Sequence, residues 1–590
     1  MREISAPEPR LKRLQRKLSA VLTELDMETQ VAPPGRVLAH GFRKGHSIVT
    51  NAHRHVGRRH VLNVDIADFF PSFNFGRVRG FLIKHRDFML PEVVATLICQ
   101  ISFHKNVLPQ GAPTSPVLTN IVGRFLDIEL VRLAKRTGSR YSRYADDITF
   151  STNAKEVPSQ LAVRRGGRWA ASDVLIGAVS RAGFRLNESK TRLSTRTGRQ
   201  TVTGLTVNAK VNVPASYYRY ARSMTHALFA TGAFDMPNSM RPKDRKKRRD
   251  AGSRGLLRLV PIAIRRLVAR LIDGAVNAPS RFIATRATLV VKAKLPSTKS
   301  DLDQLGGILS YLWSIKRLPT GDGKNEDQIK EEASVPKGAR RLYRDFLFFR
   351  YFHANPFPII LTEGPTDVVY LKTAIRRRAA NFPILAEIDS AGKVRLKVRF
   401  LRHTPSVTEL LQLTGGTDPI KKFILEYDRI ISRFSAPGGY NPVIIVVDND
   451  DGSRGANKIY GVVSNKYLTG APMTVATGAA PTRLVKNLYL LSTPPGGKNG
   501  ESCVEDLFDA ETLGTKLDGK IFNYATGNID TTKEYGKSVF SEKVVLDGQD
   551  YIDFSGFDPL LDRISSAILA HKAVVAANPK NTVPVAVSVL

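Results

Sequence analysis

The sequence has little cysteine and no long hydrophobic run. Its two cysteines, Cys99 and Cys503, lie far apart in a chain of 590 residues and match neither a zinc site nor a disulfide framework. No stretch approaches the roughly 18 apolar residues that a membrane-spanning helix needs. Residues 1–20 lack the apolar core of a signal peptide. These absences predict a cytoplasmic protein with no membrane partner.

Acidic residues are scarce in the first half of the chain. Residues 1–300 hold 53 Lys and Arg against 20 Asp and Glu, whereas residues 301–590 hold 36 against 33. This imbalance predicts that the first half binds a polyanion, with nucleic acid as the first choice. The second half must do something else. The length is too great for one core, so we expect two or three domains.

Three aspartates stand at the ends of predicted β-strands. Asp65 lies in "LNVDIADFF" (62–70), and Asp146 and Asp147 lie in "YADDITFS" (144–151). Paired carboxylates in an apolar stretch require a positive partner. Three of them from adjacent strands can hold two Mg²⁺ ions, which is the arrangement of nucleotidyl transfer. A solvated turn is the alternative for YADD taken alone.

Flanking stretches supply further candidates for this chemistry. Phe70 could exclude a 2′-hydroxyl and so favour deoxynucleotides. Gln110 and Gly111 in "LPQGAPTSPVLTN" (108–120) form a turn followed by small residues that can lie flat against a base pair. Lys190 in "AGFRLNESKT" (182–191) could protonate a leaving pyrophosphate.

This set of motifs, in this order, resembles reverse transcriptases over roughly residues 30–300. The resemblance implies that Asp65, Asp146 and Asp147 are the catalytic, metal-binding acids with two Mg²⁺ ions. It also implies that Phe70 is the steric gate and Lys190 the late lysine. Gln110 and Gly111 match the template-and-nucleotide platform. Arg43 and Lys44 lie where the fingers of these enzymes contact the triphosphate.

Two short stretches narrow the resemblance to bacterial retrons. "NAHRH" (51–55) resembles the retron NAxxH motif through Asn51, Ala52 and His55, and Val202, Thr203 and Gly204 resemble the VTG motif before the thumb. A packing or capping histidine and an ordinary strand entry are the alternatives. We expect Asn51, His55 and the VTG residues to contribute to substrate binding.

The resemblance to retrons implies a specific activity and set of partners. Such an enzyme primes from the 2′-hydroxyl of a guanosine in its own non-coding RNA and copies part of that RNA into DNA. The branched product, msDNA, stays bound. Deoxynucleoside triphosphates are the substrates, and a host ribonuclease H removes the template. Self-association is a further expectation. The basic helices of the thumb would recognise RNA shape and backbone, although a solubility loop is the alternative for "KDRKKRR" (243–249).

A second group of acids lies beyond residue 340. Glu363 follows a predicted strand in "LTEGPTDVVYLK", and Asp448 and Asp450 end the apolar strand "NPVIIVVDNDDG" (441–452). Alternate residues of a strand share a face, so the last two acids could share one cation. Glu363 could act as general base or complete the metal shell. Acids at the carboxyl ends of parallel strands lie where open α/β sheets bind ligands.

These residues resemble the glutamate and DxD motifs of Toprim domains, over roughly residues 356–500. The resemblance implies that Glu363, Asp448 and Asp450 are catalytic and hold one or two Mg²⁺ ions. Two cysteines cannot form the zinc module of a primase, which leaves a nuclease acting on DNA or RNA. Turn chemistry in a nucleotide-binding fold is the alternative. Glu505 and Asp506 could be extra ligands or acids at a helix start.

We therefore expect a multidomain α/β and α+β protein. A right-hand polymerase would have fingers and palm at 1–205 and a basic helical thumb at 206–317. A linker at 318–345, an α/β Toprim domain with a mainly parallel sheet at 346–510 and a helical extension at 511–590 would follow. Known retrons of this kind resemble toxin–antitoxin systems of phage defence. The rival interpretation is a mobile-element or intron-type reverse transcriptase with an accessory or catalytically inert Toprim module.

Overall fold

The computed structural model describes most of the chain in two compact units. The first contains Met1–Tyr218 and Ile315–Leu318, and the second contains Arg219–Ser314 and Pro319–Leu590. The described residues are 5–29, 37–236, 299–316, 337–450, 452–454, 457–467, 481–496, 500–523 and 529–577. Most of the predicted thumb, including the basic stretch 241–250, and most of the predicted linker lie outside them. No helix among the described residues is long and apolar enough to cross a membrane.

The first unit is built on an antiparallel sheet with the strand order β2-β3-β1-β6. These strands are β1 (His60–Asp65), β2 (Arg140–Tyr144), β3 (Asp147–Thr152) and β6 (Arg192–Thr195). The structure confirms the strand predicted around Asp65, but the single strand predicted around "YADDITFS" is instead a hairpin, in which a turn at Ala145 and Asp146 separates β2 from β3. Val61, Leu62 and Val64 of β1 are buried. The central strand β1 therefore carries Asp65 on a rigid support.

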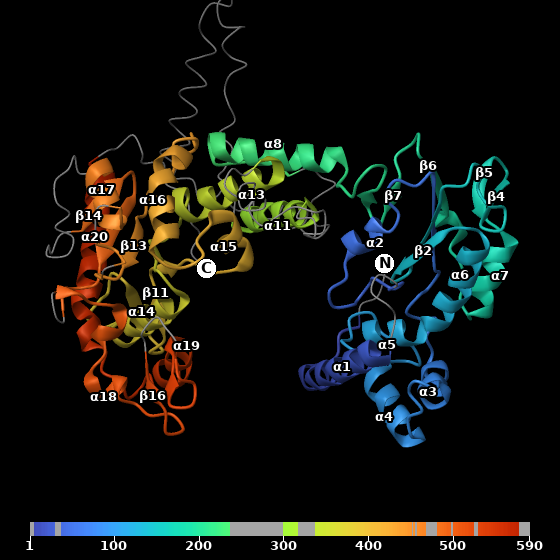
Figure 1. The fold of residues 1–590 in the computed structure, drawn as a ribbon, viewed down its shortest axis with the longest axis horizontal. Helices are drawn as coiled ribbons and strands as arrows, with labels where there is room; N and C mark the ends of the chain where they lie inside the picture. Colours follow the sequence, from blue (N-terminus) through green and yellow to red (C-terminus); the bar gives the residue numbers. More distant parts are fainter. Residues whose placement is uncertain are drawn as a thin grey trace, which may run out of the picture. The chain divides into compact units, whose positions relative to one another are not determined.

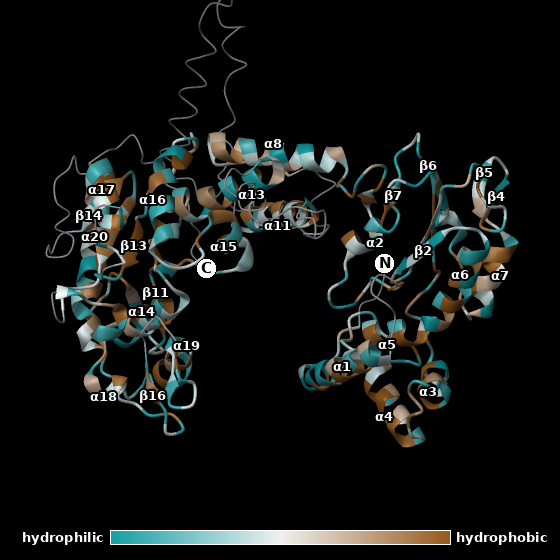
Figure 2. Cartoon of the chain, viewed as in Figure 1, coloured by the Kyte–Doolittle hydropathy of each residue, from teal (hydrophilic) through white to brown (hydrophobic). Residues whose placement is uncertain are grey.

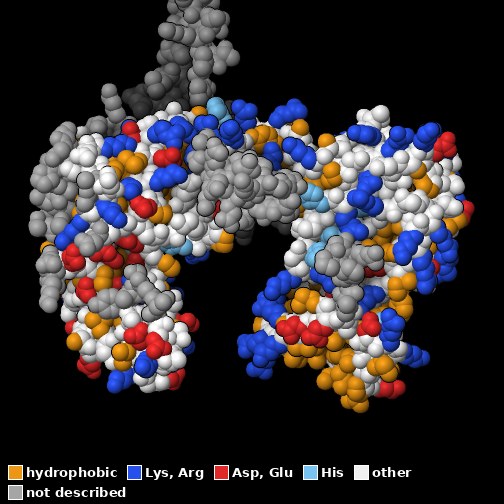
Figure 3. All heavy atoms as spheres, in the orientation of Figure 1, with side chains coloured by type: hydrophobic (Ala, Val, Ile, Leu, Met, Phe, Trp, Pro, Cys, Tyr) orange, Lys and Arg blue, Asp and Glu red, His pale blue; other side chains and the backbone are white. Residues whose placement is uncertain are grey.

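Helices pack around this sheet and form one hydrophobic core with it. They are α1 (Pro9–Thr29), α3 (Phe75–Lys84), α4 (Glu92–Ser102), α5 (Ser115–Val122), α6 (Arg124–Arg136) and α7 (Asp173–Arg181). Leu22 anchors helix α1 in this core. Helix α4 and the preceding turn leave Met89, Val93 and Leu97 exposed, and hydrophobic side chains gather there in Figure 3.

The second unit contains a mainly parallel sheet, as predicted, with the strand order β12-β9-β13-β15-β14. Its strands are β9 (Ile359–Leu361), β12 (Arg399–Phe400), β13 (Val443–Val447), β14 (Thr482–Val485) and β15 (Leu488–Ser492). Only the edge strand β14 runs antiparallel to its neighbour. All five residues of β13 are buried, and Figure 2 shows this strand as hydrophobic. A continuous β-branched run is typical of such a central strand.

Helices cover this sheet and position the loops that follow its strands (Figure 1). They are α14 (Pro365–Arg377), α16 (Thr417–Ile431), α17 (Ile459–Tyr467) and α20 (Asp558–Ala576). Helix α20 packs on β15, where the Tyr489 hydroxyl oxygen lies 3.3 Å from His571 Nδ1. Phe540, Phe554 and Phe557 belong to the same core as the sheet. The described part of 511–590 is thus not a separate extension, because its aromatic residues help to bury the sheet.

Two predicted boundaries differ from the structure. Helix α13 (Gly338–Phe348) begins inside the predicted linker and continues as a π-helical turn, η4 (Phe349–His353). Its residues Tyr343 and Phe346 are buried, so residues 338–345 are not a linker. Within the same unit, Phe229 of α8 (Ala215–Thr231) contacts the Phe349 and Phe434 rings. Asp303 of α11 (Lys299–Lys316) pairs with Arg350. The described helices of the predicted thumb therefore pack with the residues that follow the linker.

Candidate active sites

The three aspartates of the first unit meet at one edge of its sheet. Asp65 is the last residue of β1 and Asp147 the first of β3, and they are directly opposite each other in the antiparallel ladder. Asp146 precedes Asp147 in the tight turn between β2 and β3, and its carbonyl oxygen accepts a hydrogen bond from Ile66 N at 3.1 Å. The hairpin β2–β3 thus brings the acids of two distant motifs together.

Lys190 already neutralises one of these carboxylates. Its Nζ lies 2.8 Å from Asp65 Oδ1 and 2.9 Å from Oδ2. The lysine ends a short helical turn, η1 (Glu188–Lys190), and Asn187 N donates to Asp65 O at 2.7 Å. The Asp65 side chain is 10% exposed and that of Lys190 is 47% exposed. A nearly buried carboxylate requires a positive partner, and in this structure the lysine supplies it. Lys190 would have to leave Asp65 to reach a pyrophosphate.

Gly41, which the sequence analysis did not identify, packs closely against the turn that carries Asp146. A Cβ added at Gly41 would lie 2.6 Å from Ala145 N, which is closer than real Cβ contacts. Gly41 O accepts a hydrogen bond from Asn120 Nδ2 at 2.8 Å. Ala145 itself has a positive φ of 55°. The loop that begins at Gly41 therefore packs directly on the turn. Gly41 lies two residues before Arg43, but the sequence did not single it out because its contact, Ala145, is far away along the chain.

The predicted nucleotide-contacting residues come from three loops. Arg43 and Lys44 follow Gly41, and Lys44 is exposed. Phe70 is half-buried, with its ring centroid 6.1 Å from that of Phe42. Gly111 is exposed and has a φ of 114°, a conformation that favours glycine. The backbone carbonyl of Gln110 accepts a hydrogen bond from Ser5 N at 3.1 Å. Phe70 and Arg43 are thus both linked to the loop at Gly41.

Asn51 and His55, which we expected to bind substrate, lie inside the protein and not at its surface. Both are fully buried. His55 Nε2 lies 2.7 Å from Ser142 Oγ, and His55 Nδ1 lies 2.7 Å from Ser151 Oγ. The Ser142 hydroxyl in turn donates to Asn51 Oδ1 at 2.6 Å. Any effect of these two residues on substrate must act through the strands that they hold.

The direction of this hydrogen-bond chain fixes the state of the histidine. Because the Ser142 hydroxyl donates to Asn51, it accepts from His55 Nε2–H. His55 Nδ1 is then the acceptor for Ser151. Burial, followed by the neighbouring Arg54, His40 and Arg140, lowers the pKa of His55 to about 3. A neutral imidazole therefore bridges β2 and β3, the two strands that flank the Asp146 turn.

The VTG residues form the turn of a small hairpin. Strands β7 (Thr201–Val202) and β8 (Leu205–Thr206) are joined by Thr203 and Gly204, both with positive φ. This is the geometry of a type I′ turn. Thr203 Oγ1 donates to Ile48 O at 3.4 Å, which ties the turn to α2 (Ile48–His53). Val202 is fully buried and so cannot touch substrate. The two retron-like motifs are therefore in contact through α2.

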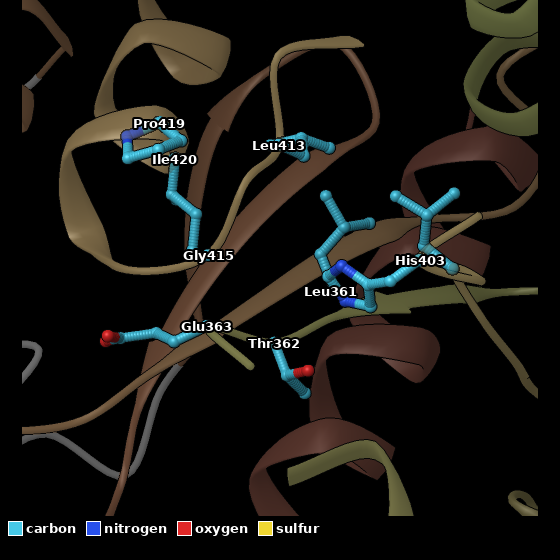
Figure 4. Close-up of a pocket in the computed structure, with 9 residues that line it drawn as sticks. Leu361, Thr362, Glu363, His403, Leu413, Gly415, Pro419 and Ile420 are labelled. Atoms are coloured by element: carbon cyan, nitrogen blue, oxygen red, sulfur yellow. The ribbon is translucent and has the colours of Figure 1, made fainter. Parts of the chain in front are cut away.

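The second unit brings its acids together beyond the carboxyl ends of β9 and β13. Glu363 Oε1 accepts a hydrogen bond from Asp448 N at 3.0 Å. Asp448 Oδ1 accepts one from Val504 N at 3.0 Å. Asp367, at the start of α14, accepts from Gly364 N at 2.8 Å. Glu363 also lines a pocket with His403 and other residues, and Figure 4 shows its carboxylate directed away from that histidine.

Asp450 does not continue the strand as expected. Strand β13 ends at Val447, and Asp450 Oδ1 instead accepts a hydrogen bond from Ser453 N at 3.1 Å in its own loop. Asn449 between the two aspartates is fully buried and bonded to Gly500 O. Asp448 and Asp450 therefore do not share a strand face, and the loop sets the position of Asp450.

Mutual proximity and burial change the charge state of this acid group. Burial, together with Asp450 and Asp367, raises the pKa of Glu363 to about 7. Burial and Glu363 raise the pKa of Asp448 to about 8. Glu505 is fully buried, and Lys537 Nζ lies 3.0 Å from its Oε1. Acids with raised pKa values near neutrality are typical of functional sites.

Oxygen ligands of both acid groups suit Mg²⁺ by their chemistry. In the described parts of the chain, however, no group of three or more His, Cys, Asp and Glu side chains is arranged to hold a metal ion. Lys190 occupies the place of a cation at Asp65, and the acids near Glu363 are held in raised-pKa states. In both units the carboxylates suit magnesium by their chemistry, but they are not gathered around a metal position in this structure.

The first unit is similar in sequence to known proteins. Residues 1–214 match the family described as "Reverse transcriptase (RNA-dependent DNA polymerase)". The retron Mx65 reverse transcriptase of Myxococcus xanthus is 41% identical over 244 residues, covering 38% of this chain and 52% of the relative. The retron Ec86 reverse transcriptase of Escherichia coli is 33% identical over 190 residues, covering 32% of this chain and 55% of the relative.

The chain thus spans about half the length of these curated relatives. Among solved structures, a truncated apo telomerase from Candida tropicalis matches with 12% identity and a TM-score of 0.24, over 34% of this chain and 45% of that one. Residues 1–214 therefore have the sequence of a reverse transcriptase region, similar to the enzymes of retrons.

Proposed function

We propose that this chain is a retron reverse transcriptase that makes RNA-linked DNA. The observation that carries the proposal is the meeting of Asp65 and Asp147 across β1 and β3, within the region that matches reverse transcriptases. The retron-like motifs around His55 and Thr203 support the assignment to the retron subfamily of reverse transcriptases. The enzyme would start DNA synthesis from the 2′-hydroxyl of a guanosine in its own non-coding RNA. It would keep the branched product bound.

Each candidate residue of the first unit would have its own role in nucleotide transfer. Mg²⁺ bound by Asp65, Asp146 and Asp147 would lower the pKa of the attacking hydroxyl and neutralise charge on the leaving group. Lys190, released from Asp65, would give a proton to the pyrophosphate. Phe70 would exclude a 2′-hydroxyl from the incoming nucleotide. Gln110 and Gly111 would support the nascent base pair, and Arg43 and Lys44 would hold the triphosphate.

DNA synthesis on a primed RNA template tests the polymerase. The variant Asp146→Asn, Asp147→Asn should lose activity by more than about a thousandfold, because neither neutral amide can replace an anionic ligand. Asp68→Asn is a matched control: Asp68 is exposed and follows Asp65 closely, and it should retain activity. Equal DNA synthesis by the double variant and the wild type would remove these aspartates from the mechanism.

We also propose that the second unit is a Toprim-type, metal-dependent nuclease that acts as the effector. The raised pKa values of Glu363 and Asp448 support this second function, since acids whose pKa values are perturbed by burial and by one another are typical of functional sites. One or two Mg²⁺ ions held by Glu363, Asp448 and Asp450 would supply the electrophilic assistance for phosphodiester cleavage. By analogy with retron defence systems, the RNA–DNA complex would keep this nuclease silent until phage interference releases it.

Variants of the acid group separate an active nuclease from an inert module. Glu363→Gln and Asp448→Asn should each abolish Mg²⁺-dependent cleavage of single-stranded DNA or RNA and any toxicity in cells. The exposed Glu511→Gln is the control and should change neither. Full toxicity in both site variants would favour an inert Toprim module. If no gene for a structured non-coding RNA lies beside the gene of this protein, the rival interpretation of a mobile-element or intron-type reverse transcriptase is favoured.

A further inference from the structure

Five arginines lie at the edge of the first unit's sheet that is opposite to its aspartates. Strands β1 and β2 begin at this edge, and the antiparallel strands β3 and β6 end there. Arg58 and Arg59 directly precede β1, and Arg54 caps helix α2 just before them. Arg140 is the first residue of β2, and Arg196 directly follows β6. Four separate chain segments meet at this edge, and three of them contribute arginines.

This arginine edge is well separated from the catalytic edge. Strand β1 runs from His60 to Asp65. With a rise of about 3.3 Å for each residue, its two ends are about 17 Å apart. A phosphate held by the arginines is therefore not a phosphate of the incoming nucleotide or of the primer end at Asp65.

The arginines are held in place by the protein rather than gathered by chance. The fully buried side chain of Gln200 donates through Nε2 to Arg58 O at 2.9 Å and to Arg59 O at 3.2 Å. Arg196 N also donates to Arg59 O, at 2.9 Å. Arg140 Nη1 donates to Arg54 O at 3.1 Å. These bonds fix the backbone that presents the guanidinium groups.

Four of the arginines at this edge have no acidic partner among the described residues. Other arginines of the same unit have acidic partners, such as Arg132 with Glu129 and Arg165 with Asp173. Within the described residues, Arg58, Arg59, Arg140 and Arg196 form no ion pair with any carboxylate. Burial and the nearby Arg140 both lower the pKa of Arg58, so the cations repel one another. Glu156 follows β3 at this edge, but it is exposed and forms no ion pair with them.

We propose that Arg54, Arg58, Arg59, Arg140 and Arg196 bind backbone phosphates of an RNA segment that is not being copied. This inference rests on the proposed polymerase function. Guanidinium groups present paired N–H donors that match the oxygens of a phosphate. Several of them along one edge fit consecutive phosphates of a nucleic acid. Before the first nucleotide is added, RNA is the only nucleic acid that such an enzyme holds.

Binding of a short blunt-ended RNA duplex to the full-length protein tests the site, with the dissociation constant measured over a range of salt. The variant Arg58→Gln, Arg140→Gln should bind about tenfold more weakly at physiological salt. The slope of log affinity against log salt should fall by about two, because about one counterion is released for each neutralised phosphate. The matched control Arg132→Gln, Arg165→Gln removes the same charge from ion-paired arginines and should leave the slope unchanged.

Two results would overturn the site. One is an unchanged slope in Arg58→Gln, Arg140→Gln. The other is an equal loss in the control pair, which would show that only total charge matters. A loss of the same size with a DNA duplex of the same sequence would overturn the assignment to RNA. The wild type's ability to make DNA is measured separately, so failure of the polymerase proposal would be distinguished from failure of this site.

Discussion

At the scale of single residues, His55 belongs to a motif that the sequence reveals, but the sequence does not reveal what the histidine does. The sequence contains the NAxxH pattern, but the partners of His55 are Ser142 and Ser151, which are 87 and 96 residues away. Nothing in the local sequence indicates that the imidazole would connect two strands of a hairpin. The aspartates were easier to predict, because each stands in a distinctive pattern next to a strand.

His55 should therefore affect catalysis by positioning the Asp146 turn. His55→Ala leaves the buried Ser151 hydroxyl without its partner, which costs about 1–3 kcal/mol, and removes one of the two hydrogen bonds of the Ser142 hydroxyl. We expect kcat for DNA synthesis to fall at least tenfold while KM for the nucleotide changes little. His55→Gln keeps a donor for Ser142 and should recover part of kcat.

The same variants also test the charge state of the histidine. With a pKa of about 3, His55 stays neutral throughout the working range, so its removal should not change the shape of the rate profile between pH 6 and 8. A purely structural defect would lower the amount of folded enzyme and spare kcat. Unchanged kcat in folded His55→Ala would contradict the positioning role.

At the scale of elements, the strands that carry the acids were predictable and their supports were not. The runs "HVLNVD" and "VIIVV" have the β-branched and apolar content of buried strands, and both form central strands. The predicted strands in turn indicate where the acids lie, because residues at the ends of neighbouring strands meet at the same edge of a sheet. The loop that moves Asp450 off the strand face and the packing of α20 on β15 depend on long-range contacts, which periodicity does not contain.

Gly41 should be intolerant of any side chain. A Cβ there would lie 2.6 Å from the backbone nitrogen of Ala145, and the backbone cannot move away without shifting the Asp146 turn. We expect Gly41→Ala to lower the rate of DNA synthesis at least tenfold. Gly80→Ala in α3 is the control, since a Cβ there meets nothing within 4 Å. It should keep full activity, and equal activity of both variants would refute the proposed contact.

The acid group of the second unit should make that unit less stable as the pH rises. Glu363 and Asp448 have folded-state pKa values of about 7 and about 8, above those of the unfolded chain. The folded state therefore holds protons that the unfolded state releases, and stability falls between about pH 5 and pH 8. We expect a loss of several kcal/mol, since one pKa unit corresponds to about 1.4 kcal/mol and the coupled pair retains at least one proton over most of this pH range.

Hydrogen exchange of the β9 and β13 amides, corrected for the intrinsic rate at each pH, measures this change within the full chain. Glu363→Gln, Asp448→Asn should abolish the pH dependence, and Mg²⁺ should restore protection to the wild type at pH 8. The exposed Glu511→Gln should behave as the wild type does. Protection that increases from pH 5 to 8 would contradict the raised pKa values.

At the scale of the whole molecule, the charge imbalance and the two acid groups predicted two different activities in one chain. The family match ends at residue 214, and the similarity to retron enzymes also lies in a limited part of the chain. In the proposed mechanism, the RNA–DNA complex would couple the polymerase to the second unit. Sequence patterns within either unit cannot specify such a coupling, because it would depend on a third component.

The nucleic acid that purifies with the full-length protein tests the central claim most directly. After ribonuclease treatment, the account predicts one discrete single-stranded DNA joined to a guanosine through its 2′-oxygen. The variant Asp146→Asn, Asp147→Asn should carry RNA only. Heterogeneous RNA without branched DNA from the wild type would contradict the retron assignment, even if the protein polymerises DNA on an added template.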